Sequence, residues 1–208
     1  MKSTAYFLTL LVVFACSAEE SDNVGSAEED TTSEKQFVEN VQEDTIQSNH
    51  PDYEIEKVTE GYKVRHKKFQ FESVFPGPPE YKINDFTKKG GSEIAYIFNY
   101  TDENGIVRRV TISEYTDPSK VWSYDDKLAF WQGQQIENEF EVHEIDFLED
   151  KAIRLKRTQF PFNYYELHFL RDQCHYCFEI VYDTAEQMAS DKGASLDMLM
   201  ESFRFMEK

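Results

Sequence analysis

Residues 164–182 read YYELHFLRDQCHYCFEIVY, and this stretch decides the predicted fold. On both sides of the central RDQC, large apolar side chains alternate with polar ones, which is the period of a half-buried β-strand. Two such runs joined by a short polar segment predict an antiparallel hairpin. One face carries the aromatic and aliphatic residues and is expected to be the core side. The other face carries Glu166, His168, His175, Cys177 and Glu179.

Further strand-like runs precede this hairpin. Turn signals separate them, among them Pro76-Gly77 and Asn104-Gly105, the latter typical of a type I′ turn. The runs are residues 69–75, 81–86, 93–101, 106–115, 140–148 and 152–160. Helical periodicity follows Asp117, an expected N-cap, and returns from Ala185 to Phe203. This order predicts an α+β fold, an antiparallel meandering sheet with two main helices packed on it.

Two short motifs resemble those of a known family. Residues 71–79, FESVFPGPP, resemble the FxVxFPGxP opening of small secreted PsbP-like domains, and residues 200–205, MESFRF, are similar to their closing helix-to-strand step. The resemblance covers about residues 62–205 and implies an α/β/α sandwich. It implies no active site, because these domains are mostly small binding or assembly factors without a shared catalytic residue set.

The N-terminus predicts a leader and a lipid anchor. Lys2 precedes an apolar run at residues 6–15, which is too short to span a bilayer, and no other run approaches that length. Val13-Phe14-Ala15-Cys16 resembles the lipobox of bacterial lipoproteins. This implies a signal peptide at residues 1–15 and acyl chains, such as palmitate, on Cys16. The alternative is an ordinary secretory leader cut after Ala18.

An acidic segment follows the predicted anchor. Residues 17–56 contain 13 acidic residues and one basic residue, and such a stretch cannot bury enough apolar surface to fold alone. We expect residues 16–60 to be the lipidated cysteine and a disordered tether, and residues 61–208 to be the globular domain. Ser17-Ala18-Glu19-Glu20 resembles the surface-export signal of lipoproteins in the Bacteroidetes group. This implies the outer membrane, with the cell surface as one option; otherwise these glutamates only begin the linker.

Composition narrows the possible functions. The chain has 208 residues and a formal net charge of −18, which excludes nucleic acid as an expected partner, because phosphate binding needs a basic face. Its 15% aromatic residues argue against a wholly disordered chain, and three cysteines are too few for a disulfide scaffold.

Cys174 and Cys177 are the first candidates for chemistry. With Cys16 lipidated they form an even pair in an oxidising compartment, so we predict a disulfide at the turn. Regular strand geometry would instead place them on opposite faces as free thiols. A thiol-disulfide oxidoreductase is a third possibility, although the helix N-terminus that activates such a pair is not predicted after Cys177.

A metal site is the alternative use of the same hairpin. If Asp172 and Gln173 form the turn, His168 faces Cys177, and His168, His175 and Cys177 share a face with two glutamates. Imidazole, thiolate and carboxylate ligands could bind zinc. The competing interpretation is a polar, solvent-facing side of the hairpin, with no cofactor. His50, His66 and His143 have no ligand spacing and are expected at the surface.

Basic streaks occur within this acidic chain, at residues 63–68, 108–109 and 151–157. They could bind an anionic glycan or lipid headgroup, or the acidic tether, or they could be solvated strand faces. No set of residues resembles a nucleophile with its base. We therefore expect a membrane-anchored, non-enzymatic binding or assembly module with a protein or anionic ligand, and the Cys174–Cys177 dithiol as the enzymatic alternative.

Overall fold

The computed structural model describes residues 50–138, 140–159 and 161–207. The predicted leader, Cys16 and most of the predicted tether lie outside these residues. No helix within them is long and apolar enough to cross a membrane.

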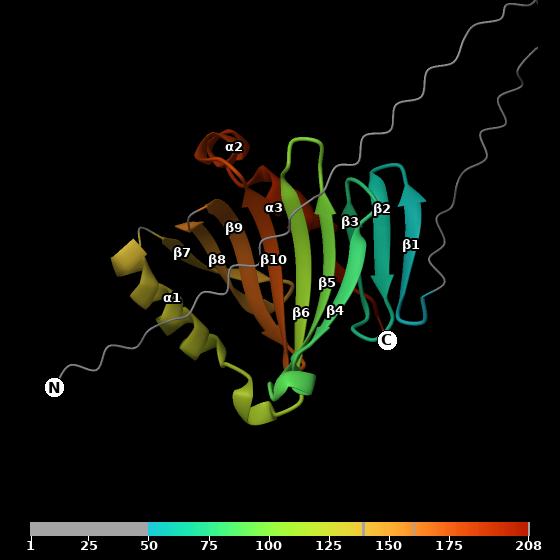
Figure 1. The fold of residues 1–208 in the computed structure, drawn as a ribbon, viewed down its shortest axis with the longest axis horizontal. Coiled ribbons are helices and arrows are strands. Elements are labelled where there is room, and N and C mark those ends of the chain that lie inside the picture. Colours follow the sequence, from blue (N-terminus) through green and yellow to red (C-terminus); the bar gives the residue numbers. More distant parts are fainter. Residues whose placement is uncertain (1–49, 139, 160, 208) are drawn as a thin grey trace, which may run out of the picture. The chain divides into compact units, whose positions relative to one another are not determined.

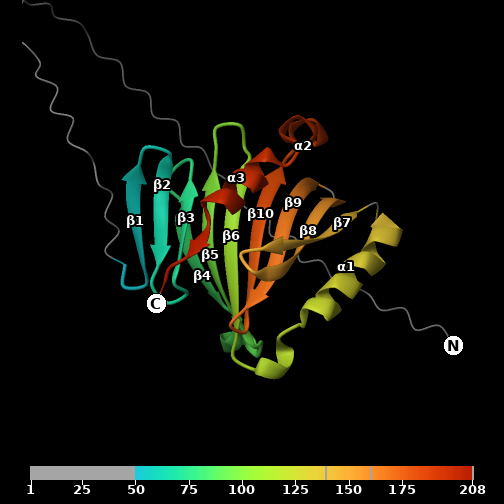
Figure 2. The same ribbon diagram turned by 180° about the vertical axis from the view of Figure 1, so that it is seen from behind.

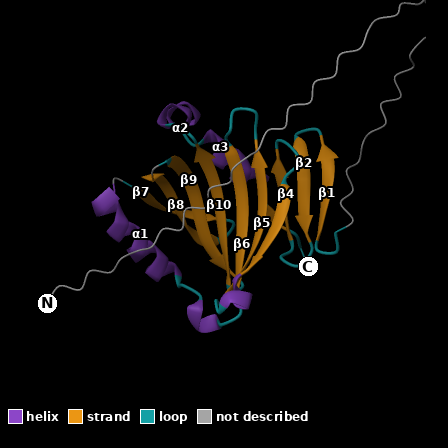
Figure 3. Cartoon of the chain, viewed as in Figure 1, coloured by secondary structure: helices purple, strands orange, loops and turns teal. Residues whose placement is uncertain are grey.

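Two antiparallel sheets form the frame of the domain (Figures 1 and 3). The seven-stranded sheet has the order β4-β5-β6-β10-β9-β8-β7, and the four-stranded sheet has the order β1-β2-β3-β11. The strands of the larger sheet are β4 (Glu80–Asp85), β5 (Glu93–Thr101), β6 (Val107–Tyr115), β7 (Glu141–Phe147), β8 (Asp150–Gln159), β9 (Phe162–Arg171) and β10 (Cys174–Tyr182). Those of the smaller sheet are β1 (Tyr53–Val58), β2 (Gly61–His66), β3 (Phe71–Phe75) and β11 (Arg204–Phe205).

Helices cover both faces of the seven-stranded sheet. The helical elements are η1 (Phe86–Lys89), η2 (Pro118–Lys120), α1 (Tyr124–Asn138), α2 (Ala185–Asp191) and α3 (Ala194–Ser202). Helix α1 contacts β7 and β8 on one face, and α3 contacts β10 and β3 on the other, as Figures 1 and 2 show from opposite sides. The predicted α+β class, with helices packed on an antiparallel sheet, is confirmed.

The apolar core lies between the seven-stranded sheet and the layer formed by the smaller sheet and α3. Phe203 follows α3 and lies 5.0 Å from Phe71 on β3 and 4.7 Å from Phe178 on β10, measured between ring centroids. Phe98, Phe169 and Ile112 are also fully or almost fully buried there. These residues come from alternate strand positions, so the period of two in the sequence directly builds the core.

The domain begins earlier than predicted. Strand β1 lies inside the segment expected to be tether, and it pairs with β2 so that Ile55 faces Val64. Ile55 is only 7% exposed and belongs to the core. The acidic residues that suggested a linker occupy the solvent side of this strand, where Glu54 and Glu56 pair with Lys67 and Arg65.

The predicted N-cap at Asp117 is confirmed, and the helical segment that follows it is broken, because Pro118–Lys120 forms the short helix η2 before α1 starts at Tyr124. One local prediction is wrong. The Asn104-Gly105 turn is not type I′, because only Gly105 has a positive φ, of 79°. The Asp102 carboxylate instead accepts hydrogen bonds from the N–H groups of Asn104 and Ile106.

The register of the cysteine hairpin is confirmed. Asp172 and Gln173 form its turn with φ values of 51° and 64°, and His168 lies opposite Cys177. Glu166 lies opposite Glu179 on the same two strands.

Candidate functional site

Glu166, His168 and His175 on the polar side of the cysteine hairpin are buried, and Cys177 and Glu179 are partly buried, contrary to the solvent-facing side expected as one alternative. Glu166 is its centre, and the Arg157 guanidinium donates to it through Nη2 (2.6 Å) and Nε (3.0 Å). Burial alone would raise the pKa of Glu166, but hydrogen bonds from His168 and Arg157 outweigh burial and lower the pKa to about 2. Glu166 is therefore a carboxylate at neutral pH.

Two histidines continue this network. His168 Nε2 lies 3.3 Å from the Glu166 carboxylate, and His168 Nδ1 lies 3.0 Å from His175 Nε2. A carboxylate only accepts, so we assign the His168 proton to Nε2, and His175 then donates to His168 Nδ1. Burial is the main reason that the pKa of His175 lies well below its ordinary value, and the charge of Lys127 acts in the same direction. His175 is neutral in the folded protein.

The predicted zinc ligands are brought together but do not converge on one point. The two ring nitrogens of His168 face different neighbours: Nδ1 faces His175, and Nε2 faces Glu166. Cys177 Sγ lies 3.9 Å from His168 Nε2. Arg157 already occupies the carboxylate. The part of the chain that the structure describes holds no group of three such side chains arranged for a metal ion.

The predicted disulfide is wrong for this structure, because both cysteines belong to the regular strand β10. Cys174 lies on the core face and Cys177 on the polar face, and both thiols are free. Burial raises the pKa of Cys174 to about 11 and the pKa of Cys177 well above its ordinary value. Both therefore stay protonated, whereas a dithiol oxidoreductase needs a thiolate.

Helix α1 covers this buried polar layer, which we define as Arg157, Glu166, His168, His175 and Cys177. Trp131 of α1 packs against His168, with ring centroids 5.7 Å apart, and its buried indole N–H has no hydrogen-bond partner among the residues that the structure describes. Burial lowers the pKa of Lys127, which lines a neighbouring cavity of about 10 Å³. That volume is near the minimum for one water molecule, so this cavity has no room for a larger ligand.

Most of the basic streaks form ion pairs within the fold. Arg65 pairs with Glu56 and Glu72, Lys68 with Glu114, and Arg109 with Glu179. The remaining pairs are Lys67–Glu54, Arg108–Asp102, Lys151–Asp146, Arg154–Asp197, Lys156–Glu141 and Arg157–Glu166. His66, expected at the surface, is fully buried. Within residues 50–207 as described, Lys63 is the one cation of these streaks without a direct ion pair, although its charge contributes to the lowered pKa of Glu72.

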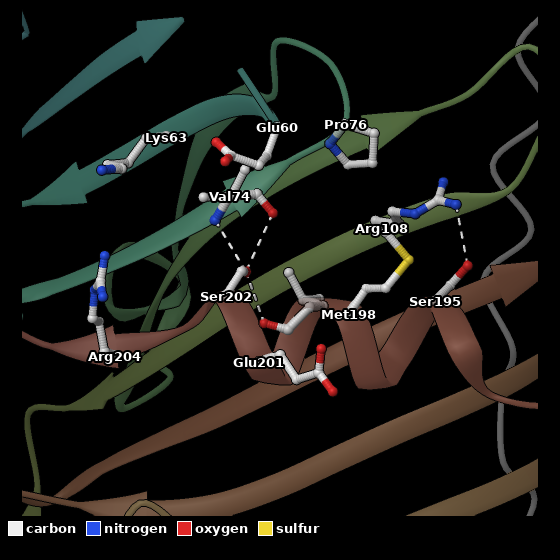
Figure 4. A pocket seen from close by; sticks show the side chains of 11 residues that line it. Glu60, Lys63, Val74, Pro76, Arg108, Ser195, Met198, Glu201, Ser202 and Arg204 are labelled. Atoms are coloured by element: carbon white, nitrogen blue, oxygen red, sulfur yellow. Dashed lines mark hydrogen bonds between the residues drawn. The ribbon is translucent and has the colours of Figure 1, made fainter. Parts of the chain in front are cut away.

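A cleft of about 510 Å³ lies beside α3 and the edge of β3 (Figure 4). Its floor is apolar, with Val74, Pro76, Met198 and Leu199, and its rim is charged. The other lining residues are Glu60, Lys63, Arg108, Ser195, Glu201, Ser202 and Arg204. Figure 4 shows Lys63 and Arg204 at one end and Arg108 at the other, with Glu60 and Glu201 along the sides.

Arg108 is held in a fixed orientation at its end of the cleft. Its Nη1 donates to the Asp102 carboxylate at 2.8 Å, and its Nη2 donates to Ser195 Oγ at 3.1 Å. Asp102 also organises the β5–β6 turn through backbone hydrogen bonds. The same carboxylate therefore shapes the hairpin and positions the guanidinium.

Ser202, at the end of α3, closes the edge of β3 inside the cleft. Its Oγ accepts from the Val74 N–H at 3.1 Å and lies 3.3 Å from the Val74 carbonyl oxygen (Figure 4). Strand β11 pairs with β3 at Glu72, so the hydroxyl takes over where the strand pairing stops. The cleft floor thus has its backbone groups satisfied.

A second hollow, of about 550 Å³, lies at the start of α1. Trp122 and Phe130 line it, and their side chains are 44% and 43% exposed. The other lining residues are Ser119, Lys120, Val121 and Asp126. The two rings meet edge to face at 5.5 Å. The structure leaves both aromatic side chains at the surface.

The structure is similar to the solution structure of a cyanobacterial PsbP protein (CyanoP) from Synechocystis, at 12% sequence identity and a TM-score of 0.45, covering 69% of this chain and 91% of that chain. It is also similar to the crystal structure of a Pseudomonas aeruginosa protein of unknown function, at 11% identity and a TM-score of 0.35, covering 71% and 94%. No protein-family model matches the sequence, and neither does any curated protein. Both TM-scores lie below 0.5, so the α+β class rests on the strands and helices themselves.

Proposed function

We propose that this chain is a lipid-anchored, non-enzymatic binding module of the bacterial outer membrane, and that it binds an anionic ligand in the cleft beside α3. The observation that carries the proposal is the arrangement of Lys63, Arg204 and Arg108 at the two ends of an apolar floor. A cleft of a few hundred Å³ with apolar lining and few polar groups is typical of ligand sites.

The charges around the cleft support an anionic ligand. Lys63 forms no direct ion pair among the described residues, although its charge helps to lower the pKa of Glu72. Arg204 is 65% exposed although it pairs with Glu72. Arg108 is only 14% exposed, and its position next to the cleft makes it a partly desolvated cation. Charge-assisted hydrogen bonds from such groups are the stronger ones.

The buried polar layer supports a role without catalysis. Its thiol is protonated, its carboxylate is held by Arg157, and its cavity accepts no more than a water. A nucleophile has to reach its substrate, and none of these groups is placed to do so.

An anionic, apolar fluorescent probe, anilinonaphthalene sulfonate (ANS), tests the cleft. The described residues between 50 and 207 belong to one compact unit, so the experiment can use the chain from Ser17 onward, without the predicted leader and Cys16. We expect ANS to bind and Lys63→Glu to weaken binding by about fivefold to tenfold, the effect of about 1 to 1.4 kcal/mol. The matched control is Lys151→Glu, which makes the same charge change at an exposed residue paired with Asp146.

A Trp122→Ala variant separates the cleft from the second hollow. If Trp122→Ala abolishes ANS fluorescence and Lys63→Glu behaves like Lys151→Glu, the anionic site does not lie beside α3. The proposal would then be wrong about the cleft.

The anchor is tested on the full-length protein. Mass spectrometry should show Cys16 as the first residue, bearing diacylglycerol and an amide-linked acyl chain, and Cys16→Ser should abolish both processing and lipid. A wild-type protein without lipid that begins at Glu19 would identify an ordinary secretory leader instead.

A further inference from the structure

The composition of the cleft lining distinguishes between classes of anionic ligand. None of its eleven residues is aromatic. Sites for acidic sugars commonly present an aromatic ring on which the apolar face of the sugar stacks. The exposed rings of Trp122 and Phe130 lie in the second hollow instead. The cleft therefore lacks the usual platform for a glycan.

The distribution of charge disfavours a lipid. A lipid headgroup places its negative charge at one end of an apolar chain. This cleft has cations at both ends, Lys63 and Arg204 opposite Arg108, and a short apolar floor between them. The ligand that fits has an apolar centre and a negative group on each side.

The two acidic residues of the rim add a requirement for hydrogen-bond donors. Glu60 and Glu201 line the sides of the cleft, and the structure gives neither of them an ion pair within the described residues. Free carboxylates accept hydrogen bonds and would repel a uniformly charged polyanion. A polypeptide brings N–H donors along its length as well as acidic side chains.

The floor suits an apolar side chain of variable shape. Met198 is 62% exposed and stands beside Val74 and Leu199. Methionine is flexible and polarizable, and it is frequent on surfaces that accept different peptides. The backbone of Val74 is already satisfied by Ser202, so a ligand is held by side chains here and does not extend the sheet.

We infer that the cleft binds an extended segment of a partner protein in which an apolar residue is flanked on both sides by acidic residues. The inference rests on the proposed function of the cleft and specifies the class of its ligand. Acidic side chains pair with Lys63 or Arg204 and with Arg108, and the apolar residue lies against Met198.

Isothermal titration calorimetry with unlabelled probes tests the inference. The probe is an acetylated and amidated hexapeptide of two glutamates, two leucines and two glutamates, added to the chain from Ser17 onward. We expect saturable binding that Met198→Glu weakens at least tenfold and Lys63→Glu several-fold. The control variant is Ile83→Glu, which puts the same acidic residue at another exposed apolar position, 46% exposed on β4. Circular dichroism checks that each variant is folded.

Three further probes decide between the ligand classes. A hexapeptide with lysine in place of glutamate should not bind. Heparin or vesicles of anionic phospholipid that bind in the cleft more tightly than the acidic peptide would overturn the inference in favour of a glycan or a lipid. Absence of peptide binding while ANS still binds beside α3 would overturn it and leave the proposed function intact. Failure of ANS to bind there would reject both.

Discussion

On β9 and β10, alternate residues face two different interiors. Leu167, Phe169 and Phe178 point into an apolar core with Phe203, whereas Glu166, His168 and Cys177 point toward α1. The first interior is held by contact between rings, and the second by charge-assisted hydrogen bonds among groups that are costly to bury. The comparison shows that one sheet can be stabilised by opposite means on its two faces.

The apolar face should show the largest response to a single substitution. Phe178 is fully buried and contacts Phe203, so Phe178→Ala should lower the free energy of unfolding by about 3 to 5 kcal/mol. Urea denaturation followed by circular dichroism measures this loss. Phe162→Ala, at a ring that is 39% exposed, is the control and should cost much less. A loss for Phe178→Ala near that of the control would mean that this face is not the main core.

A substitution on the polar face should lower the free energy of unfolding because it leaves the charged partner of the replaced residue without its ion pair. Glu166→Gln leaves the Arg157 charge without its counter-ion and with one of its two hydrogen bonds to residue 166 lost, and we expect a cost of about 3 kcal/mol. The exposed pair of Asp146 and Lys151 is the control, and Asp146→Asn should cost less than about 1 kcal/mol. Adding Arg157→Leu to Glu166→Leu should recover part of the stability, because no buried charge then lacks its partner. If the double variant is no more stable than Glu166→Gln, the ion pair itself contributes more to the free energy of unfolding than we expect.

Acid should lower the stability of the domain through His175 on the polar face and, separately, through His66 on the smaller sheet. Burial lowers the pKa of His66 to about 4 and that of His175 well below its ordinary value. The unfolded chain takes up these protons near pH 6.5 and the folded chain does not, so stability is full above that pH and falls below it. Each histidine contributes about 1.4 kcal/mol per pH unit in this window, which for His66 ends near pH 4.

The slope of stability against pH measures this effect, and His175→Gln should make it shallower. Glu179 opposes it, because burial raises the pKa of Glu179 and the folded state then holds a proton more firmly. The comparison of wild type with His175→Gln removes that contribution, since Glu179 is present in both. Equal slopes of the unfolding free energy against pH in the two proteins would show that His175 takes up its proton in the folded protein as readily as in the unfolded chain.

Register and fold class were predictable because they depend on neighbouring residues. A two-residue turn at Asp172 and Gln173 fixes which residue faces Cys177, and strand alternation separates the two faces. The burial of the polar face was not predictable, because it depends on where α1 places Trp131. The cleft was missed because Lys63, Arg108 and Arg204 are distant in sequence and meet only through the topology. Strand β1 was missed because its acidic outer side resembles a linker.

The smallest expected effect concerns the thiols. Since Cys174 and Cys177 lie on opposite faces of β10, a reductant should leave the thermal unfolding temperature unchanged. Titration with a thiol reagent should find both cysteines unreactive in the folded protein and reactive after denaturation, because burial keeps them protonated. Loss of stability on reduction would indicate a disulfide after all. It would also require β10 to depart from regular strand geometry.

The Asp102–Arg108 pair gives the two ends of the cleft different thermodynamic characters. Arg108 is already immobilised by Asp102 and Ser195, so a ligand that contacts it loses little side-chain entropy. Lys63 has no such partner, and ordering it on binding costs about 0.5 to 1.5 kcal/mol. The Arg108 end is therefore preorganised and selective for geometry, whereas the Lys63 end can follow a negative charge whose position varies. A set of ligands that share one fixed anionic group and differ in the other would suit such an asymmetric site.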